Sequence, residues 1–437
     1  MNDKLLTTLM QKIEEPSARY ADLDRYYTGT QPLAFLAPES RRALGDRFGR
    51  LATNLPRLAV TSLAERLRVT GFTGADVWSD WLRNDLDQES GVAHREALLL
   101  GASYVIVWAD QFGRPKVTVE SARQVAVLTD PGTRRITAAV KRWETATTTE
   151  AVVYLPDEII RLRAEQTGAT TAGFTVVETL ANPIGVVPVV RLKNSDRLLD
   201  DGVSEIVDVV PLVDALNKVL VDMMTTSEFV GRPRRWATGI ELEEEDVLDE
   251  NGQPTGETVA TNPIPEGDRA MISENDSAKF GQLEAAGLDG YSTAVDVLLG
   301  QIMAVSALPA HYVGQLSDTP ASADALRAAE ASLTARAEAR QASFGRSWED
   351  VARLMVAVRD GADPQRVDVR VTWADAATRS IAQEADAVVK LFQAGLLPAS
   401  YALKRLGYSD TEVTEIAAAR RGDSLNSMAV DLGKLVS

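Results

Sequence analysis

The side chains that most often carry catalysis are scarce in this sequence. Its two histidines, His94 and His311, do not form the His-Glu-x-x-His pair of a zinc protease. It contains no cysteine, which excludes thiol nucleophiles and Cys-ligated metals. Neither the Gly-x-Ser-x-Gly elbow of hydrolases nor a phosphate-binding P-loop occurs. His94 falls within a predicted helix, where its role is either structural or catalytic.

Two charged clusters remain near the middle of the chain. The densest basic–aromatic cluster consists of Arg232, Arg234, Arg235 and Trp236. An acidic run follows it, with carboxylates at Glu241, Glu243, Glu244, Glu245 and Asp246. The arginines either form salt bridges with this acidic run or contact DNA or a protein partner. The carboxylates either form a solvated face or hold a metal ion, as in a metal-dependent nuclease.

The overall charge limits how the chain can meet nucleic acid. Its 437 residues include 46 basic and 63 acidic ones, for a formal net charge of −17. A protein that grips DNA phosphates normally has a basic face, so only a local one is possible here. A net negative surface suits DNA that must pass without sticking. No apolar run approaches the roughly 18 residues of a membrane span, and the charged N-terminus does not resemble a secretory signal.

The elements that must position these residues include a long helix predicted over residues 323–359. Its apolar positions are Leu326, Leu333, Ala337, Phe344, Trp348, Val351, Met355 and Val358. Steps of three, four and seven residues match a helix with one buried face. Such a helix is about 50 Å long, and we expect it to serve an assembly rather than a compact active site. Gly345 is its expected bend.

A loop rich in small residues precedes this helix, over residues 307–321. Its polar and aromatic members are His311, Tyr312, Gln315, Ser317 and Thr319. The loop is either an ordinary connection between helices or a functional segment, and its length favours function because long structureless loops are uncommon in compact domains.

The remaining pattern predicts helices first and an antiparallel β module second. Helices are expected over 1–28 (with a break near Pro16), from about 54, over 74–86 and over 89–100. Strands are expected at 103–108, 116–120, 125–128, 136–143, 151–155, 159–163, 174–180 and 189–192. A helix over 204–227 either begins or kinks at Pro211. Residues 230–280 are predicted to form a small α/β insertion or an extended loop. A helix is expected at 289–307, a strand at 367–373 and three short helices from 379 to 421.

Taken in order, these elements resemble the portal proteins of tailed bacteriophages, particularly the siphophage type of actinobacterial viruses. The resemblance rests on Tyr-Tyr-Thr-Gly at 26–29 with Asn-Leu-Pro-Arg at 54–57, and on the helix ending at 228 that continues as Phe-Val-Gly-Arg-Pro-Arg-Arg-Trp. It also rests on Ala-Leu-Pro at 307–309, followed by Thr-Pro-Ala-Ser-Ala-Asp-Ala-Leu at 319–326. The similarity covers most of the chain.

The resemblance implies an α+β, portal-type fold with named parts. They are an α/β wing (1–200), a first stem helix (201–229), a small α/β clip (230–282), a second stem helix (283–307), a tunnel loop (308–321), a long kinked tunnel helix (322–360), a return strand to the wing (361–378), and a C-terminal helical crown region with a tail (379–437). The tunnel loop would line the channel, and the arginine cluster would contact partners from the clip.

The resemblance also implies a function and a set of partners. The chain would form a homo-oligomeric ring, typically of about twelve copies, at one capsid vertex. Double-stranded DNA would be packaged and ejected through its channel without sequence specificity. The terminase large subunit, a head–tail adaptor and the major capsid or scaffold protein would dock on it, with assembly in the host cytoplasm and residence in the virion. No cofactor, catalysis or membrane is implied.

Two other interpretations stay open at the level of sequence. The long helix would also suit a non-catalytic coiled-coil scaffold or adaptor protein of a phage or bacterium. The acidic run leaves room for a metal-dependent nuclease.

Overall fold

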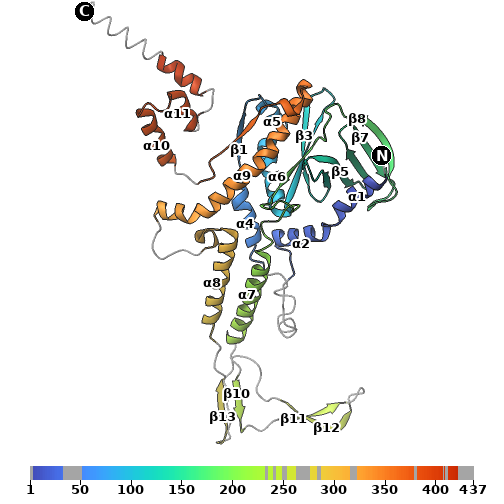
Figure 1. Cartoon of the computed structure of the whole chain (residues 1–437). Coiled ribbons are helices and arrows are strands. Elements are labelled where there is room, and N and C mark those ends of the chain that lie inside the picture. The colour runs from blue at the N-terminus through green and yellow to red at the C-terminus, as the bar shows by residue number, and fades with distance from the viewer. Residues whose placement is uncertain are drawn as a thin grey trace, which may run out of the picture. The chain divides into compact units, whose positions relative to one another are not determined.

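The computed structural model divides the chain into two compact units (Figure 1). It describes residues 3–32, 52–231, 235–239, 243–248, 253–261, 276–282, 287–314, 322–377, 381–406, 408 and 412–421. The first unit contains residues 1–319 and 335–374, and the second contains residues 320–334 and 375–437. Helices and antiparallel sheets alternate in blocks along the first unit, which confirms the predicted α+β class.

The N-terminal helices match the sequence pattern in number, but the one predicted over 74–86 is shorter and the one predicted over 89–100 begins earlier. They are α1 (Asp3–Glu14), α2 (Ser17–Thr28), α4 (Leu55–Ala64), α5 (Trp78–Arg83) and α6 (Leu86–Leu100). The break near Pro16 is confirmed. The helix predicted over 74–86 is shorter than expected because Gly74 and Asp85 have φ of 95° and 55°, which no α-helix accommodates. The short strand β1 (Val69–Thr73) was not predicted.

The predicted antiparallel module consists of two sheets. One has the strand order β3-β2-β9, and the other has the order β4-β5-β6-β7-β8. The strands are β2 (Ala102–Ala109), β3 (Pro115–Ser121), β4 (Val125–Thr129), β5 (Ile136–Glu144), β6 (Thr149–Tyr154), β7 (Glu158–Ala164), β8 (Thr175–Ala181) and β9 (Val189–Lys193). Hairpin neighbours in the chain pair directly, which explains why period-two patterning located these strands.

Helix α1 covers one face of the five-stranded sheet. Its apolar residues at helical spacing, Leu6, Leu9, Met10 and Ile13, are buried against the sheet. The sheet contributes Ala126, Ala138, Val140, Ala151, Val153, Ile160 and Leu162 to the same core. Small alanines on β4, β5 and β6 leave room for the larger side chains of the helix.

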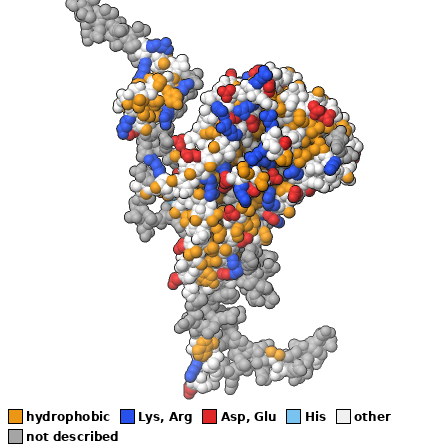
Figure 2. Space-filling model, in the orientation of Figure 1, with side chains coloured by type: hydrophobic (Ala, Val, Ile, Leu, Met, Phe, Trp, Pro, Cys, Tyr) orange, Lys and Arg blue, Asp and Glu red, His pale blue; other side chains and the backbone are white. Residues whose placement is uncertain are grey.

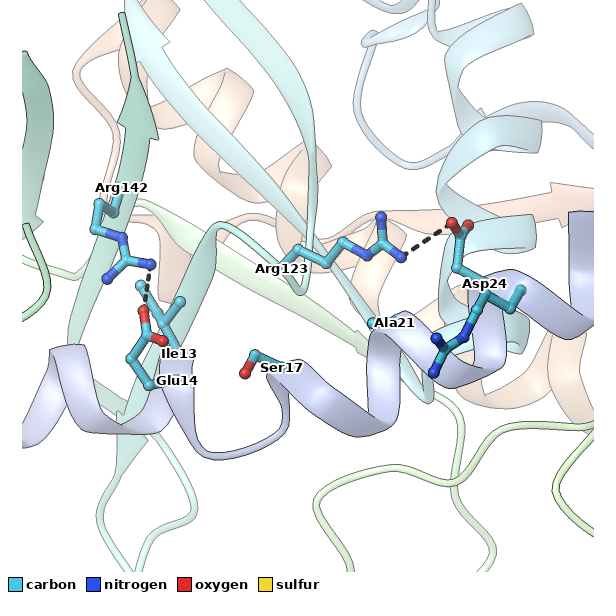
Figure 3. A pocket seen from close by; sticks show the side chains of 8 residues that line it. Ile13, Glu14, Ser17, Ala21, Asp24, Arg123 and Arg142 are labelled. Atoms are coloured by element: carbon cyan, nitrogen blue, oxygen red, sulfur yellow. Dashed lines mark ion pairs between the residues drawn. The ribbon is translucent and has the colours of Figure 1, made fainter. Parts of the chain in front are cut away.

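Ion pairs fasten α1 and α2 on either side of a hollow of about 490 Å³ (Figure 3). Glu14, at the end of α1, pairs with Arg142 of β5. Asp24 of α2 lies 3.3 Å from Nη2 of Arg123, and the same guanidinium donates to the Tyr20 carbonyl. The two helices are therefore attached at both sides of the break at Pro16.

Helices α7 (Val210–Gly231) and α8 (Asp289–Ser306) pack against each other and against α4. Val213, Leu216 and Ile302 form the buried centre of this contact. Helix α7 begins at Val210, so Pro211 lies in the first turn, where its missing N–H costs nothing. Of the two alternatives at Pro211, the helix start is the one observed.

Between these helices, the described residues contain strands only, where an α/β insertion or a loop was expected. Strand β10 (Arg235–Thr238) pairs with β13 (Lys279–Gln282), and β11 (Glu243–Leu248) pairs with β12 (Pro254–Thr261). Both pairs are antiparallel two-stranded ladders.

The long predicted helix is α9 (Ala323–Asp360), continuous through Gly345. After it, η3 (Pro364–Arg366) leads to β14 (Arg370–Trp373). This strand is shorter than the one predicted over 367–373 because β1 pairs only with residues 370–373. Strand β14 pairs with β1. A Cβ on Gly345 would lie 3.1 Å from Cγ1 of Val371 and 3.2 Å from Nε1 of Trp373. Glycine at 345 therefore allows β14 to approach; the bend stays a prediction.

The second unit contains the start of α9 together with the C-terminal helices. These are α10 (Ile381–Gln393), α11 (Ala399–Arg405) and a helical segment over 412–421. Their positions agree with the three helices predicted from 379 to 421. Pro398 precedes α11 in the extended conformation that ends one helix and begins the next.

Candidate functional site

The segment after α8 carries part of the predicted loop site. Ala307 ends α8 in the left-handed conformation, with φ of 58°, and a short 3₁₀ helix, η2 (Ala310–Val313), follows. The rings of His311 and Tyr312 lie edge to face, with their centroids 4.8 Å apart. Nη2 of Arg66 donates to the Tyr312 hydroxyl at 3.1 Å, which attaches η2 to the residues after α4. Gln315, Ser317 and Thr319 lie outside the described residues.

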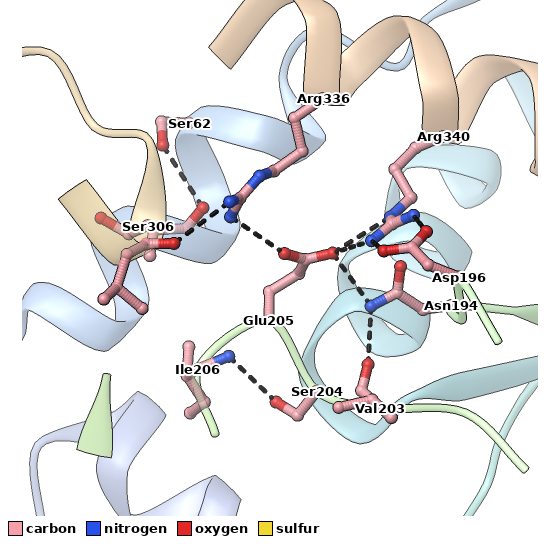
Figure 4. Close-up of polar contacts among 12 residues, drawn as sticks. Ser62, Asn194, Asp196, Val203, Ser204, Glu205, Ile206, Ser306, Arg336 and Arg340 are labelled. Carbon is pink, nitrogen blue, oxygen red and sulfur yellow. Dashed lines mark hydrogen bonds and ion pairs between the residues drawn. The ribbon is translucent and has the colours of Figure 1, made fainter. Parts of the chain in front are cut away.

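A buried charged cluster lies next to this segment, and the sequence analysis missed it (Figure 4). Glu205, which precedes α7, accepts from Arg340 at 2.8 Å and from Arg336 at 3.4 Å, both on α9. Asn194 also donates to Glu205, at 3.1 Å. Arg336 donates to the carbonyl of Val305 at 3.1 Å, where the dipole of α8 is negative. The cluster thus joins the ends of α7 and α8 to α9.

Electrostatics within the cluster favour the charged forms. Burial alone would lower the pKa of Arg340, but its hydrogen bonds with Asp196 and Glu205 hold that pKa above the ordinary value. The hydrogen bond from Arg340 lowers the pKa of Asp196. Because both groups of the Arg340–Glu205 pair are 8% exposed, water screens their attraction weakly. The sequence contains one feature that could have indicated this cluster: Arg336 and Arg340 are four residues apart, so they lie on one face of the predicted helix.

The part of α9 that follows residue 334 is buried along one face. Phe344, Trp348, Val351 and Met355 are fully buried, and Leu333 before them is 1% exposed. Leu326, the first residue of the predicted stripe, is 38% exposed in the single chain. Its packing against an adjacent subunit stays a prediction.

His94 lies inside the same aromatic core. Its Nε2 accepts a hydrogen bond of 2.8 Å from Nε1 of Trp348, and its ring stacks on Phe344 with centroids 5.5 Å apart. Burial lowers the pKa of His94 to about 3, against an opposing contribution from the Leu67 backbone. A fully buried neutral imidazole that serves as an acceptor has a structural role.

The predicted basic–aromatic cluster is described only in part. Arg232 and Arg234 lie outside the described residues, and Arg235 opens β10. Trp236 is 44% exposed and stands opposite Gly281 in the β10–β13 ladder. A Cβ at Gly281 would come within 2.6 Å of the indole, so the ring of Trp236 lies directly over that glycine. Trp236 therefore stabilises the ladder across a residue that has no side chain.

Metal binding finds no support among the residues that the structure describes. Within them, no group of three or more histidine and acidic side chains is placed to hold an ion. Glu243, Glu244, Glu245 and Asp246 belong to β11, where their backbones pair with β12. No described helix is long and apolar enough to cross a membrane.

Comparison with known proteins decides the family. Residues 10–424 match the family model described as "Phage portal protein, SPP1 Gp6-like". The chain belongs to this family of phage portal proteins. The portal protein of Mycobacterium phage D29 is 33% identical over 408 residues, which cover 87% of this chain and 80% of that protein. The portal protein of Mycobacterium phage L5 is 32% identical over 407 residues, with the same coverage.

Solved structures with a similar chain come from gene transfer agent particles. A chain of the virion of the native particle aligns with a TM-score of 0.49 and 15% identity, covering 89% of this chain and 93% of that one. A chain from the neck of the native particle, computed with C12 symmetry, aligns with a TM-score of 0.48 and 14% identity, covering 89% and 93%.

Family membership confirms three predictions made from the sequence. The resemblance to phage portal proteins was correct, and it extends over nearly the whole chain. Portal proteins are structural and non-catalytic, so the chain is not an enzyme. As a portal protein, it is a component of the virion at the portal vertex.

Proposed function

We propose that this portal protein forms a closed ring of about twelve subunits, the arrangement implied by its family resemblance, with a central channel through which double-stranded DNA is packaged and ejected. The observation that carries the proposal is the family match over residues 10–424. In this proposal the wing, stem, clip, tunnel and crown keep the boundaries given above. The ring assembles in the host cytoplasm, and the terminase large subunit, a head–tail adaptor and the capsid or scaffold protein dock on it.

The α7–α8 pair has the properties that a stem in a ring requires. Their shared face is buried, yet Val297 and Val305 of α8 remain 58% and 37% exposed. Such apolar side chains can be buried against a neighbouring subunit. The described charged side chains of the pair are Asp214, Asp222, Asp289 and Asp296, with one lysine, Lys218. An acidic stem repels DNA phosphates and lets the duplex slide.

Electron microscopy of the purified protein tests the ring directly. Closed rings with a central hole are expected, whereas a chain that stays monomeric at all concentrations contradicts the proposal. Val297→Asp is expected to lower the yield of rings because it places a charge in a dry interface. Ser292→Asp, on the same helix and exposed, adds the same charge as a control and is expected to assemble more efficiently. Equal ring yields from the two variants would show that Val297 of α8 does not lie in the subunit interface.

The loop over 308–321 is proposed to line the narrowest part of the channel. The hydrogen bond from Arg66 to Tyr312 holds η2, which supports a fixed position for the first half of the loop. Replacing residues 315–321 with a short glycine linker should leave ring formation intact and reduce the packaging or retention of DNA. Normal packaging with this variant would show that the loop does not contact the duplex.

The arginine cluster at the start of the clip is proposed to contact partners. Reversing Arg234 and Arg235 to glutamate should weaken clip assembly or terminase docking, because both depend on charge complementarity. Ring yield and terminase binding that both equal the wild type would exclude this role. Lys279→Glu, on the paired strand β13, is the matched control for added negative charge.

A further inference from the structure

A basic groove of about 990 Å³ lies in the first unit, between the β-sheets and the last turns of α9. Its cationic lining residues are Arg134, Arg135, Arg191, Lys193, Arg353 and Arg366, and its acidic ones are Asp350 and Asp368. This excess of positive charge occurs in a chain whose net charge is −17. Figure 2 shows lysine and arginine side chains gathered on the visible face of this body.

Among the residues that the structure describes, carboxylate partners are found for three of the six cations in the basic groove. Arg353 pairs with Asp350, Arg191 with Asp201 and Arg366 with Asp363. In the part of the chain that the structure describes, no ion pair is formed by Arg134, Arg135 or Lys193. Burial lowers the pKa of Lys193, the positive charge of Arg191 adds to this, and the carboxylates of Asp201 and Asp200 oppose it.

Arg134 occupies a backbone conformation that arginine does not favour. Its φ is 57°, in the left-handed region that glycine or asparagine usually fills. The turn is closed by a hydrogen bond of 2.7 Å from the Arg134 amide to the Asp130 carbonyl. Strain of this kind tends to persist where a residue has a function.

The walls of the basic groove select the kind of partner. Apolar residues also line the groove: Ile136 and Val186 are partly exposed, whereas Val187, Val189, Val190 and Leu354 are at most 8% exposed. A DNA duplex needs a basic surface that follows its backbone, and the apolar side chains between the cations offer its phosphates no partner. A peptide that alternates acidic and apolar side chains satisfies both the cations and the partly exposed Ile136 and Val186.

We propose that this basic groove binds an acidic, partly apolar peptide segment of a partner protein, with Arg134, Arg135 and Lys193 pairing its carboxylates. This contact surface lies in the first unit, and its role does not depend on DNA passage or on clip function. Because the cations are partly exposed, electrostatic attraction mainly speeds association, while the apolar contacts slow release.

Fluorescence anisotropy with the full-length protein tests the proposal. The probes are a short labelled peptide of alternating Glu and Leu, the same peptide with Gln in place of Glu, and a labelled short DNA duplex. We expect the Glu peptide to bind at least about tenfold more tightly than the Gln peptide. The variant Arg134→Glu/Lys193→Glu should weaken binding by at least about tenfold, and the neutral Arg134→Gln/Lys193→Gln by less.

Matched controls keep these outcomes decisive. The variant Arg68→Glu/Arg95→Glu makes the same charge change at exposed positions outside the groove and should bind like the wild type. Equal binding of the Glu and Gln peptides would overturn the charge argument. Duplex binding that is tighter than peptide binding, and lost in the groove variant, would assign the groove to nucleic acid. Unchanged peptide binding by both groove variants would place the site elsewhere. An unchanged thermal unfolding midpoint confirms that the variants are folded.

Discussion

Arg340 and Glu205 form a buried ion pair that joins the long helix α9 to the residues leading into α7. Nη2 of Arg340 lies 2.8 Å from Oε1 of Glu205, and Nε of the same guanidinium donates to that oxygen at 3.0 Å. Two donors on one carboxylate fix the orientation of the guanidinium plane. Any rotation of α9 about its axis relative to α7 would break these bonds. The pair therefore fixes the residues before α7 against α9.

Removing Arg340 should destabilise the chain strongly. The variant Arg340→Met keeps much of the side-chain volume but leaves Glu205 charged and buried, at a cost of about 3–5 kcal/mol in the free energy of unfolding. The double variant Arg340→Met/Glu205→Leu removes both charges and should recover part of this loss. Chemical denaturation at matched protein concentration measures both values.

Arg336 offers the comparison within the same cluster. It is 31% exposed and its contact with Glu205 is longer, at 3.4 Å, so Arg336→Met should cost clearly less than Arg340→Met. A double variant as unstable as Arg340→Met alone would show that packing, rather than the loss of the main cationic partner of Glu205, accounts for the destabilisation.

Stability should fall as the pH falls below about 6.5, because His94 is buried in its neutral form. Its pKa is lowered to about 3 in the folded chain, so between these values the unfolded chain binds one more proton. The free energy of unfolding then decreases by about 1.4 kcal/mol per pH unit from this group. The contribution is fully present above the unfolded pKa.

The variant His94→Phe isolates this effect. It loses the hydrogen bond from Trp348, at a cost of about 1 kcal/mol at neutral pH, and it can keep the stacking on Phe344. Its unfolding free energy should depend less on pH between 6 and 4 than that of the wild type. Parallel pH curves for the two proteins would show that another group controls acid sensitivity.

Alanine at Gly345 should fail to stabilise α9. Glycine to alanine inside a helix normally gains about 1 kcal/mol, but here the added methyl meets Val371 and Trp373 at 3.1 and 3.2 Å. Crowding against β14 should cancel or exceed the gain. Thermal and chemical unfolding of Gly345→Ala measure the balance.

Gly91 of α6 provides the control for this substitution. A Cβ there would meet only Nη1 of Arg95, at 3.8 Å, so Gly91→Ala should raise the unfolding free energy by about 0.5–1 kcal/mol. Stabilisation of equal size at both positions would mean that close approach of β14 is not the reason for glycine at 345.

Local patterning predicted much of this fold, and family resemblance predicted the class of protein. The 3.6-residue stripe of α9, the strands of the hairpin-connected sheet and the break at Pro16 are properties of neighbouring residues, so a single sequence contains them. The order of these elements, with short motifs such as Tyr-Tyr-Thr-Gly at 26–29, sufficed to indicate a phage portal protein.

Contacts between distant residues were decided only by the tertiary structure. Glu205 and Arg340 are 135 positions apart, and His94 and Trp348 are 254 apart. Nothing in local sequence shows that a charge will be buried or which group will face it, since both depend on how elements pack. The same holds for the basic groove, whose arginines come from the turn between β4 and β5, from β9, from α9 and from η3. The spacing of side chains along the chain determines helices and strands, whereas packing determines which distant side chains meet. Packing also decides which charges and hydrogen bonds are buried, and burial changes the energy of each of them.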